Sequence, residues 1–153
     1  MRINKLKLND QKTEFFVASS LYNFAFVKDI TIKVGNNIIP QSSTIRNLGV
    51  IFDSSMSMTE HVKSIAKSIN FHLRNIYRIR RFITFDSCNH LARSLILSRI
   101  DYANSALYGI SADDKRKLQT LQNRAAKIVF RADRRHPSAP FLKSFIGCLL
   151  TLA

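Results

Sequence analysis

Basic side chains in the middle of the chain recur at a spacing that could bind phosphate. The steps between them are 4, 7, 4 and 3 residues, so on an α-helix they would fall on one stripe. This cationic ridge consists of Lys63, Lys67, Arg74, Arg78 and Arg81. No acidic residue stands between Glu60 and Asp86, so no carboxylate one turn away neutralises the stripe. Two interpretations remain, a solvated helix face and a surface that grips a sugar-phosphate backbone.

A second group of basic residues follows later in the chain. It consists of Arg124, Lys127, Arg131, Arg134 and Arg135. The first two would lie on a helix and the others in the loop after it. Neither group has the means to read a base sequence, so both predict contact with the backbone alone.

Residues for catalysis are harder to find. Asp10, Asp29 and Asp53 are separated and form no recognisable pair of carboxylates for a metal ion. Asp113 and Asp114 stand together, but acids at a helix start are favoured by the helix dipole. The sequence holds no Gly-x-Ser-x-Gly elbow, phosphate-binding loop or GxGxxG motif. The residues themselves therefore indicate neither a catalytic centre nor a metal site.

The composition is that of a folded, strongly basic chain. With 153 residues and 46% hydrophobic residues, it has the size of one ordinary domain. The 24 Lys and Arg against 10 Asp and Glu give a net charge of +14. Such a charge attracts polyanions, which makes nucleic acid the first candidate partner. An anionic membrane surface or a ribosome-like assembly is the second.

The two cysteines and the apolar segments bear on the compartment. Cys88 and Cys148 make no disulfide framework, so we expect buried thiols in a reducing compartment. We expect no secretory signal at the start, because it lacks an apolar core. The late apolar stretch Phe145–Ala153 has nine residues, too few to span a bilayer. The expectation is an intracellular chain, in cytoplasm or nucleus, without a membrane partner.

The first third of the chain is patterned as strands. Apolar and polar residues alternate, and Gly35 with its neighbours has the chemistry of a turn. Pro40 and the following serines would end the return strand. The predicted strands are Glu14–Ala18, Leu21–Phe26, Asp29–Val34, Ile38–Ile39 and Thr44–Phe52. The aromatic residues among them are expected in the core, with base stacking as the alternative.

From Asp53 onward the apolar period becomes helical. Ser57 and Glu60 have the spacing of a capping box before a first helix that ends near Ile83. A second helix is predicted from Thr84 or Asp86 to Gly109, and a third from Ser111. The fold class is therefore α+β, a small antiparallel β part followed by a bundle of about three helices. The predicted parts are residues 1–53, 54–132 and a basic loop with tail, 133–153.

Several segments together resemble a known family. Their order is similar to that in the late palm and thumb of the reverse transcriptase of non-LTR retrotransposons, of the jockey-like LINE group. They are Asn4-x-Leu6-x-Leu8-Asn9-x-x-Lys12-Thr13-Glu14, Ile45-Arg46-Asn47-Leu48-Gly49-Val50-x-x-Asp53, Met58-x-x-His61-Val62, Leu73-Arg74-x-Ile76-x-Arg78-Ile79-Arg80, Ser98-Arg99-Ile100-Asp101-Tyr102-x-Asn104-x-x-Leu107-Tyr108-Gly109 and Leu121-Gln122-Asn123-Arg124-Ala125-Ala126. The last nine residues depart from the family's pattern.

The resemblance implies part of an RNA-directed DNA polymerase. Lys12 would assist proton transfer at the incoming nucleotide, and Leu48 with Gly49 would form a primer-grip-like turn. The helices would be a thumb that follows the RNA/DNA template–primer duplex with the cationic ridge, Arg124 and Lys127. The family's Tyr-x-Asp-Asp strand lies upstream of the Lys12 segment, so we expect no catalysis, and no cofactor, in these residues alone. Mg²⁺ and the upstream domains belong to the intact parent enzyme.

A second hypothesis stays beside the first. The chain would then be a domesticated or decayed fragment that acts as a protein-interaction module or has no function.

Overall fold

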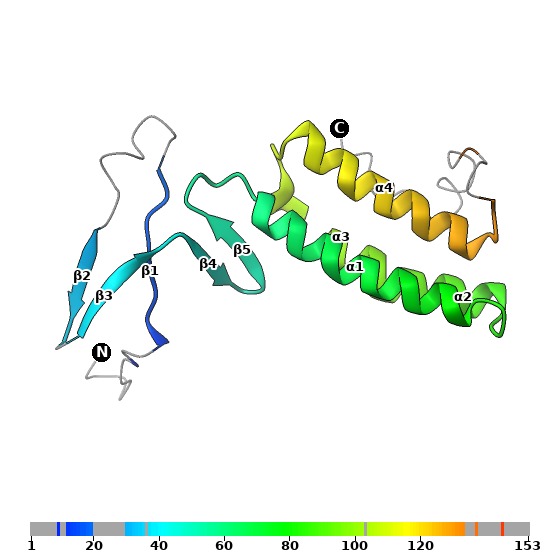
Figure 1. Ribbon diagram of the computed structural model, residues 1–153, viewed down its shortest axis with the longest axis horizontal. Helices are drawn as coiled ribbons and strands as arrows, with labels where there is room; N and C mark the ends of the chain where they lie inside the picture. Colours follow the sequence, from blue (N-terminus) through cyan, green and yellow to red (C-terminus); the bar gives the residue numbers. More distant parts are fainter. Residues whose placement is uncertain are drawn as a thin grey trace. The chain divides into compact units, whose positions relative to one another are not determined.

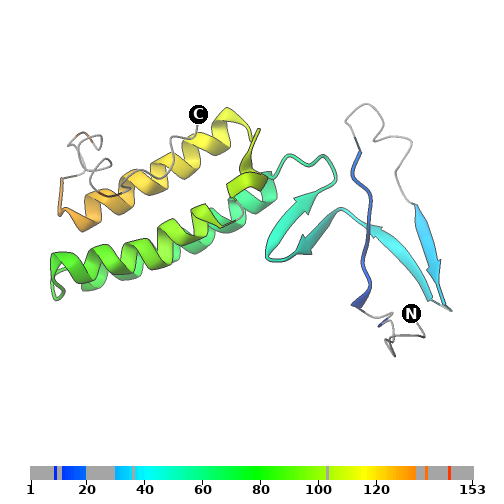
Figure 2. The same ribbon diagram turned by 180° about the vertical axis from the view of Figure 1, so that it is seen from behind.

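The computed structural model describes residues 9, 12–19, 30–35, 37–102, 104–133, 137 and 145. The chain divides into two compact units, residues 1–60 and 61–153, with strands in the first and helices in the second (Figures 1 and 2). The α+β class is confirmed. The predicted strand Leu21–Phe26, residues 134–135 and Cys148 lie outside the described residues.

The first unit holds a three-stranded sheet in the order β1-β3-β2. Strands β2 (Thr31–Val34) and β3 (Asn37–Ser42) form an antiparallel hairpin in which Ile32 pairs with Ile39. Strand β1 (Phe15–Phe16) pairs with the other edge of β3 and runs parallel to it. This parallel pair was not predicted. Because β2 and β3 are antiparallel and β1 is parallel to β3, β1 runs opposite to β2, the next described strand in the sequence.

Strand β3 continues through Pro40, where the sequence predicted its end. The reason lies in the direction of the backbone groups. The N–H of Gln41 donates to the carbonyl of Ile30 on the β2 side, so the nitrogen of Pro40 faces the other side. There β1 pairs only with Gln41 and Ser42, and the missing N–H of Pro40 leaves no ladder bond broken.

The segment predicted as one strand over Thr44–Phe52 is a hairpin. Strand β4 (Thr44–Asn47) pairs antiparallel with β5 (Val50–Asp53) across a turn at Leu48 and Gly49. Both turn residues have positive φ, 46° and 85°, as a two-residue turn of type I′ requires. Glycine adopts this conformation readily, whereas a leucine there is strained by about 1 kcal/mol.

Asp53 shapes the turn that leads from β5 into the first helix. Its Oδ1 accepts the hydroxyl of Ser55 at 2.6 Å and the N–H of Ser57 at 2.9 Å. Its Oδ2 accepts the hydroxyl of Ser57 at 3.1 Å. Burial raises the pKa of Asp53, but the hydrogen bonds from Ser55 and Ser57 outweigh it, and the pKa lies below its ordinary value. The predicted capping box is confirmed in part: the hydroxyl of Ser57 accepts the N–H of Thr59, where the helix begins, but the N–H of Ser57 donates to Asp53 instead of the predicted Glu60.

In the second unit, α1 (Thr59–Ile79) and α4 (Ala112–Val129) are the two long helices. They lie side by side and run in the same direction (Figures 1 and 2), since Asn70 contacts Arg124 and Arg80 contacts Ile128. The predicted apolar stripes are buried on both helices, except that Ile128 is half-buried and Ile83, also half-buried, lies beyond the end of α1. They comprise Val62, Ile65, Ile69, Leu73 and Ile76 on α1, and Leu118, Leu121, Ala125 and Val129 on α4.

The predicted middle helix is interrupted. It consists of α2 (Phe85–Ala92), a π-helical turn η4 (Arg93–Leu97) and α3 (Ser98–Asp101). A 3-10 turn, η5 (Asn104–Leu107), completes the connection. The hydroxyls of Ser94 and Ser98 donate to the carbonyls of His90 and Ser94, which favours the departure from regular α-helix. Thr84 caps α2 by accepting the N–H of Ser87, and Gly109 (φ 80°) stands after η5.

The buried guanidinium of Arg80 joins the ends of α1 and α4. Its Nε donates to the carbonyl of Ile128 at 3.0 Å, and its Nη2 to that of Val129 at 2.7 Å. Its Nη1 donates to Ile83 at 3.1 Å, within the turn before α2. The last carbonyls of a helix lack partners within the helix and carry partial negative charge. The guanidinium of Arg80 therefore donates hydrogen bonds to the last carbonyls of α4 and also offsets the partial negative charge at that end of the helix.

We predict that Arg80→Met lowers the free energy of unfolding by about 2–4 kcal/mol, because three carbonyls, one in a buried and two in part-buried hydrogen bonds, lose a charged donor. Arg80→Lys should recover only part of this, since an ammonium cannot reproduce the planar fork. Urea denaturation followed by circular dichroism measures both. The exposed Arg78→Ala serves as control and should stay within about 0.5 kcal/mol of the parent. Equal losses for Arg80→Met and Arg78→Ala would contradict the assignment.

Asp53→Ala should lower the free energy of unfolding by about 1–3 kcal/mol at neutral pH, because the hydroxyl of Ser55 and the N–H of Ser57 lose a charged acceptor. The folded pKa lies below the unfolded one, so this contribution is present above about pH 4 and disappears as pH falls through the folded pKa. The parent and the variant should therefore converge in stability toward low pH. Denaturation at a series of pH values gives the difference, and a gap that stays constant down to low pH would refute the role of the ionised carboxylate.

Candidate nucleic-acid interface

The cationic ridge lies on the exposed side of α1, opposite its buried stripe. Lys63, Lys67, Arg74 and Arg78 are all exposed, and Arg81 is exposed in the turn that follows the helix. The guanidinium of Arg81 stacks over the ring of Phe82, 4.5 Å from its centre. Arg116 and Lys117 form ion pairs with Asp113 and Asp114, whereas the ridge arginines Arg74, Arg78 and Arg81 form none within the described residues.

Beside the ridge, a groove of about 430 Å³ runs between α1 and α4 near their C-terminal ends. We call it the cationic groove. Its lining consists of Leu73, Arg74, Tyr77, Arg80, Arg124, Lys127, Ile128, Arg131 and Ala132. Five of these are basic and none is acidic. Cations at helix C-termini offset the partial negative charge there, but a net positive field remains in the groove.

Hydrogen bonds to neutral groups hold two of these arginines in place. Arg124 donates from Nη1 to Oδ1 of Asn70 at 2.7 Å, and the amide nitrogen of Asn70 donates to the carbonyl of Ala66. Arg131 donates from Nη2 to the carbonyl of Arg80 at 3.3 Å. Because these partners carry no net negative charge, both guanidinium groups keep their full positive charge while their positions are fixed.

Arg131 adopts a backbone conformation that normally belongs to glycine. It follows the C-cap Phe130 of α4 with φ of 53°, the left-handed region favoured by glycine after a helix. A non-glycine residue there costs about 1 kcal/mol. Arg131 nevertheless carries a cation that lines the cationic groove.

We predict that Arg131→Gly is more stable than Arg131→Ala by about 1 kcal/mol. Both variants lose the hydrogen bond to Arg80, but only glycine relieves the left-handed backbone. Thermal unfolding of the two variants, followed by circular dichroism, compares them directly. An alanine variant as stable as the glycine variant would mean that the backbone here is relaxed.

The structure gathers some of the predicted backbone-binding residues and separates others. Arg74, Arg124 and Lys127 line the groove together. Lys63, Lys67, Arg78 and Arg81 do not line it and remain a separate exposed series. Sequence reasoning missed Tyr77 and Arg80 as parts of this surface. Tyr77 could have been found, because it stands one helical turn after Arg74 on the same side of α1.

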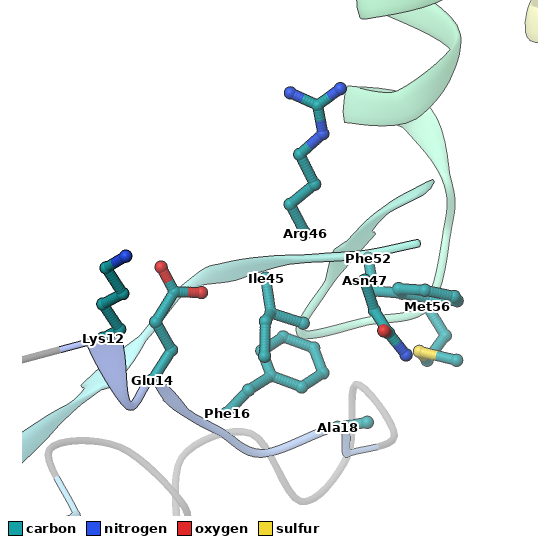
Figure 3. A pocket seen from close by; sticks show the side chains of 9 residues that line it. All are labelled: Lys12, Glu14, Phe16, Ala18, Ile45, Arg46, Asn47, Phe52 and Met56. Atoms are coloured by element: carbon teal, nitrogen blue, oxygen red, sulfur yellow. The ribbon is translucent and has the colours of Figure 1, made fainter. Parts of the chain in front are cut away.

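The first unit has a pocket of its own, with a volume of about 410 Å³ (Figure 3). Lys12 and Glu14 line it from the segment before β1, and Arg46 with Asn47 from β4. In Figure 3 the side chain of Phe16 lies beneath Ile45 and forms an apolar floor. The structure thus brings Lys12 into one pocket with the two residues that precede the Leu48–Gly49 turn. Leu48 itself is 82% exposed at the tip of the hairpin.

Other reactive groups offer no alternative centre in the described part of the chain. No three His, Cys, Asp or Glu side chains there stand together as metal ligands. Cys88 is fully buried, and burial raises the pKa of its thiol, so it stays protonated and unreactive near neutral pH. Among the helices described, none has the length and apolar character needed to cross a bilayer.

Comparison of the chain with protein-family models, curated proteins and solved structures finds no match to any of the three.

Proposed function

We propose that the helical unit binds the sugar-phosphate backbone of a nucleic acid, as the thumb-like part of a non-LTR retrotransposon reverse transcriptase. The cationic groove, which has five basic side chains and no acidic one, is the observation that carries this proposal. The cationic ridge extends the positive surface along α1. Several fixed cations close together displace the counterions of a polyanion, and this release drives sequence-independent binding.

A purely solvated helix face accounts less well for these cations. Helix dipoles favour basic residues in the last turn, which suits Arg78 and Lys127. They do not favour Lys63 or Lys67, which lie in the first half of α1. A surface selected for contact with phosphates has a use for cations along the whole helix.

Under the same proposal, the first unit is a partial palm. Lys12 would approach an incoming nucleotide, and the Leu48–Gly49 turn would hold a primer end. The shared pocket of Lys12, Arg46 and Asn47 supports this, because it places the two features within one small unit. The chain would work in cytoplasm or nucleus, and its catalytic aspartates and Mg²⁺ would come from the upstream domains of the parent enzyme.

The triple variant Lys67→Ala, Arg78→Ala and Arg81→Ala should bind duplex DNA more weakly and with less dependence on salt. With on the order of five phosphate contacts in the parent, log K should fall against log salt with a slope of about −4 to −5. Each lost contact should make the slope less negative by about 0.9. Fluorescence anisotropy with a labelled duplex, titrated at several salt concentrations, measures both slopes.

A matched control removes the same number of charges elsewhere. Lys33, Arg99 and Arg116 are exposed and lie outside the ridge and the groove, so their combined replacement by Ala should leave the slope near that of the parent. If the control flattens the slope as much as the ridge variant, net charge and not this surface governs binding. If the parent chain shows no salt-dependent binding, the proposal is wrong.

One observation favours the alternative, a protein-interaction module. Phe82 is 74% exposed in the turn after α1, and Ile79 and Phe85 are exposed nearby in the chain. Exposed apolar side chains in sequence neighbours are typical of a protein-binding surface. A partner captured without nucleic acid, with an affinity insensitive to salt and lost in Phe82→Ala, would favour this function.

A further inference from the structure

The cationic groove differs from the cationic ridge in a way that bears on the kind of nucleic acid it holds. The ridge is a row of cations on an open helix face, whereas the groove encloses its cations together with the exposed ring of Tyr77 and an apolar lining. Resting on the proposed function, we propose that the groove binds an unpaired nucleotide segment. The ring of Tyr77 would stack on a base, and Arg74, Arg124 and Arg131 would hold the adjacent phosphates.

Tyr77 is placed for stacking and is not needed for the core. Its side chain is 67% exposed although it lines the groove. The buried residues of α1 just before it in the sequence are Leu73 and Ile76, which belong to the core. An exposed tyrosine beside arginines is the usual platform for bases of a single strand, because every base has an apolar face.

The lining of the groove has apolar surface suited to the base of a nucleotide and cations suited to its phosphate. Leu73, Ile128 and Ala132 supply apolar surface between the helices, where a base can be shielded from water. Arg74 and Arg124 supply the cations on α1 and α4, one from each wall. A volume of about 430 Å³ falls in the range of small-ligand pockets, about 300–1,000 Å³. A base in a duplex is stacked inside and would have to leave the helix to reach Tyr77.

Within the described residues, the other end of the interface between α1 and α4 lacks the groove's combination of an aromatic ring with arginines that form no ion pair. A second hollow there is lined by Asn70, Asp113, Arg116 and Lys117, among others. Its cations are paired, Arg116 with Asp113 and Lys117 with the buried Asp114, and it has no aromatic lining. The charge available to an anion is therefore concentrated at the Tyr77 end, which sets where a strand would lie.

The arginines of the groove are also fixed before any ligand arrives. Arg124 is held by Asn70, and Arg131 is held by the carbonyl of Arg80 in a strained backbone conformation. Ordering long side chains in advance lowers the entropy cost of binding. A strained residue that could be glycine, yet carries a guanidinium, is the kind of outlier found at ligand sites.

The test uses the full chain and two fluorescent probes of equal length, a short oligothymidylate and a mixed-sequence duplex. Anisotropy titrations give the affinity of the parent and of Tyr77→Ala, Tyr77→Phe and Tyr108→Ala. Tyr108 is a matched control, a tyrosine 93% exposed and outside the groove. Thermal unfolding of each variant verifies that the exposed substitutions leave the fold intact.

We expect Tyr77→Ala to weaken single-strand binding by about 5- to 100-fold, the range for loss of one stacked base, and to weaken duplex binding far less, because a duplex keeps its bases stacked inside. Tyr77→Phe should bind as the parent does, because the ring is kept, and Tyr108→Ala should also match the parent. With 5-iodouracil in the oligonucleotide, ultraviolet light should crosslink the peptide that contains Tyr77.

Three results would overturn the inference. They are unchanged single-strand binding in Tyr77→Ala, an equal loss for single strand and duplex, or a loss in Tyr108→Ala as large as in Tyr77→Ala. In each case the salt dependence of duplex binding by the parent chain still tests the proposed function independently. A parent chain that binds neither probe would remove both proposals.

Discussion

The contact between Arg80 and the end of α4 determines the shape of the helical unit. Its guanidinium, buried under Ile128 and Val129, draws together the C-terminal ends of two helices that run in the same direction. Parallel helices bring partial negative charges to the same end. A buried cation offsets that repulsion, and the exposed cations nearby add to the effect. The same constraint creates the cationic groove, because it fixes the distance between the walls that carry Arg74 and Arg124.

The parts of the fold that follow from local pattern were predictable. The apolar stripe of α1 and the cap of α4 at Ser111 are set by residues one turn apart, and both are as predicted. The residue pattern alone predicts one strand across Leu48 and Gly49, because a leucine with positive φ is uncommon and the sequence has no Asn-Gly signal there. Only the family resemblance implied a turn at these two residues. The π-helical turn η4 depends on serine hydroxyls competing for carbonyls, which periodicity does not reveal.

The candidate site shows the same division between local and long-range information. Charge spacing predicted that Arg74 and Arg78 share the exposed face of α1, since that depends only on the helical period. It could not predict that Arg124, fifty residues further along the chain, would face Arg74 across a groove, because this depends on how the helices pack. Nor could it assign Arg80 to the interior, where one basic residue of a basic run serves the fold while its neighbours remain at the surface.

The central claim is that nucleic acid contacts the C-terminal ends of α1 and α4. Arginine modification by phenylglyoxal, mapped by mass spectrometry with and without an oligonucleotide, tests it most directly on the full chain. The account predicts that the oligonucleotide protects Arg74, Arg124 and Arg131, and leaves the exposed Arg99 and Arg116 as reactive as before. Protection confined to Arg99 and Arg116, or no protection at any arginine when the oligonucleotide is bound, would contradict it.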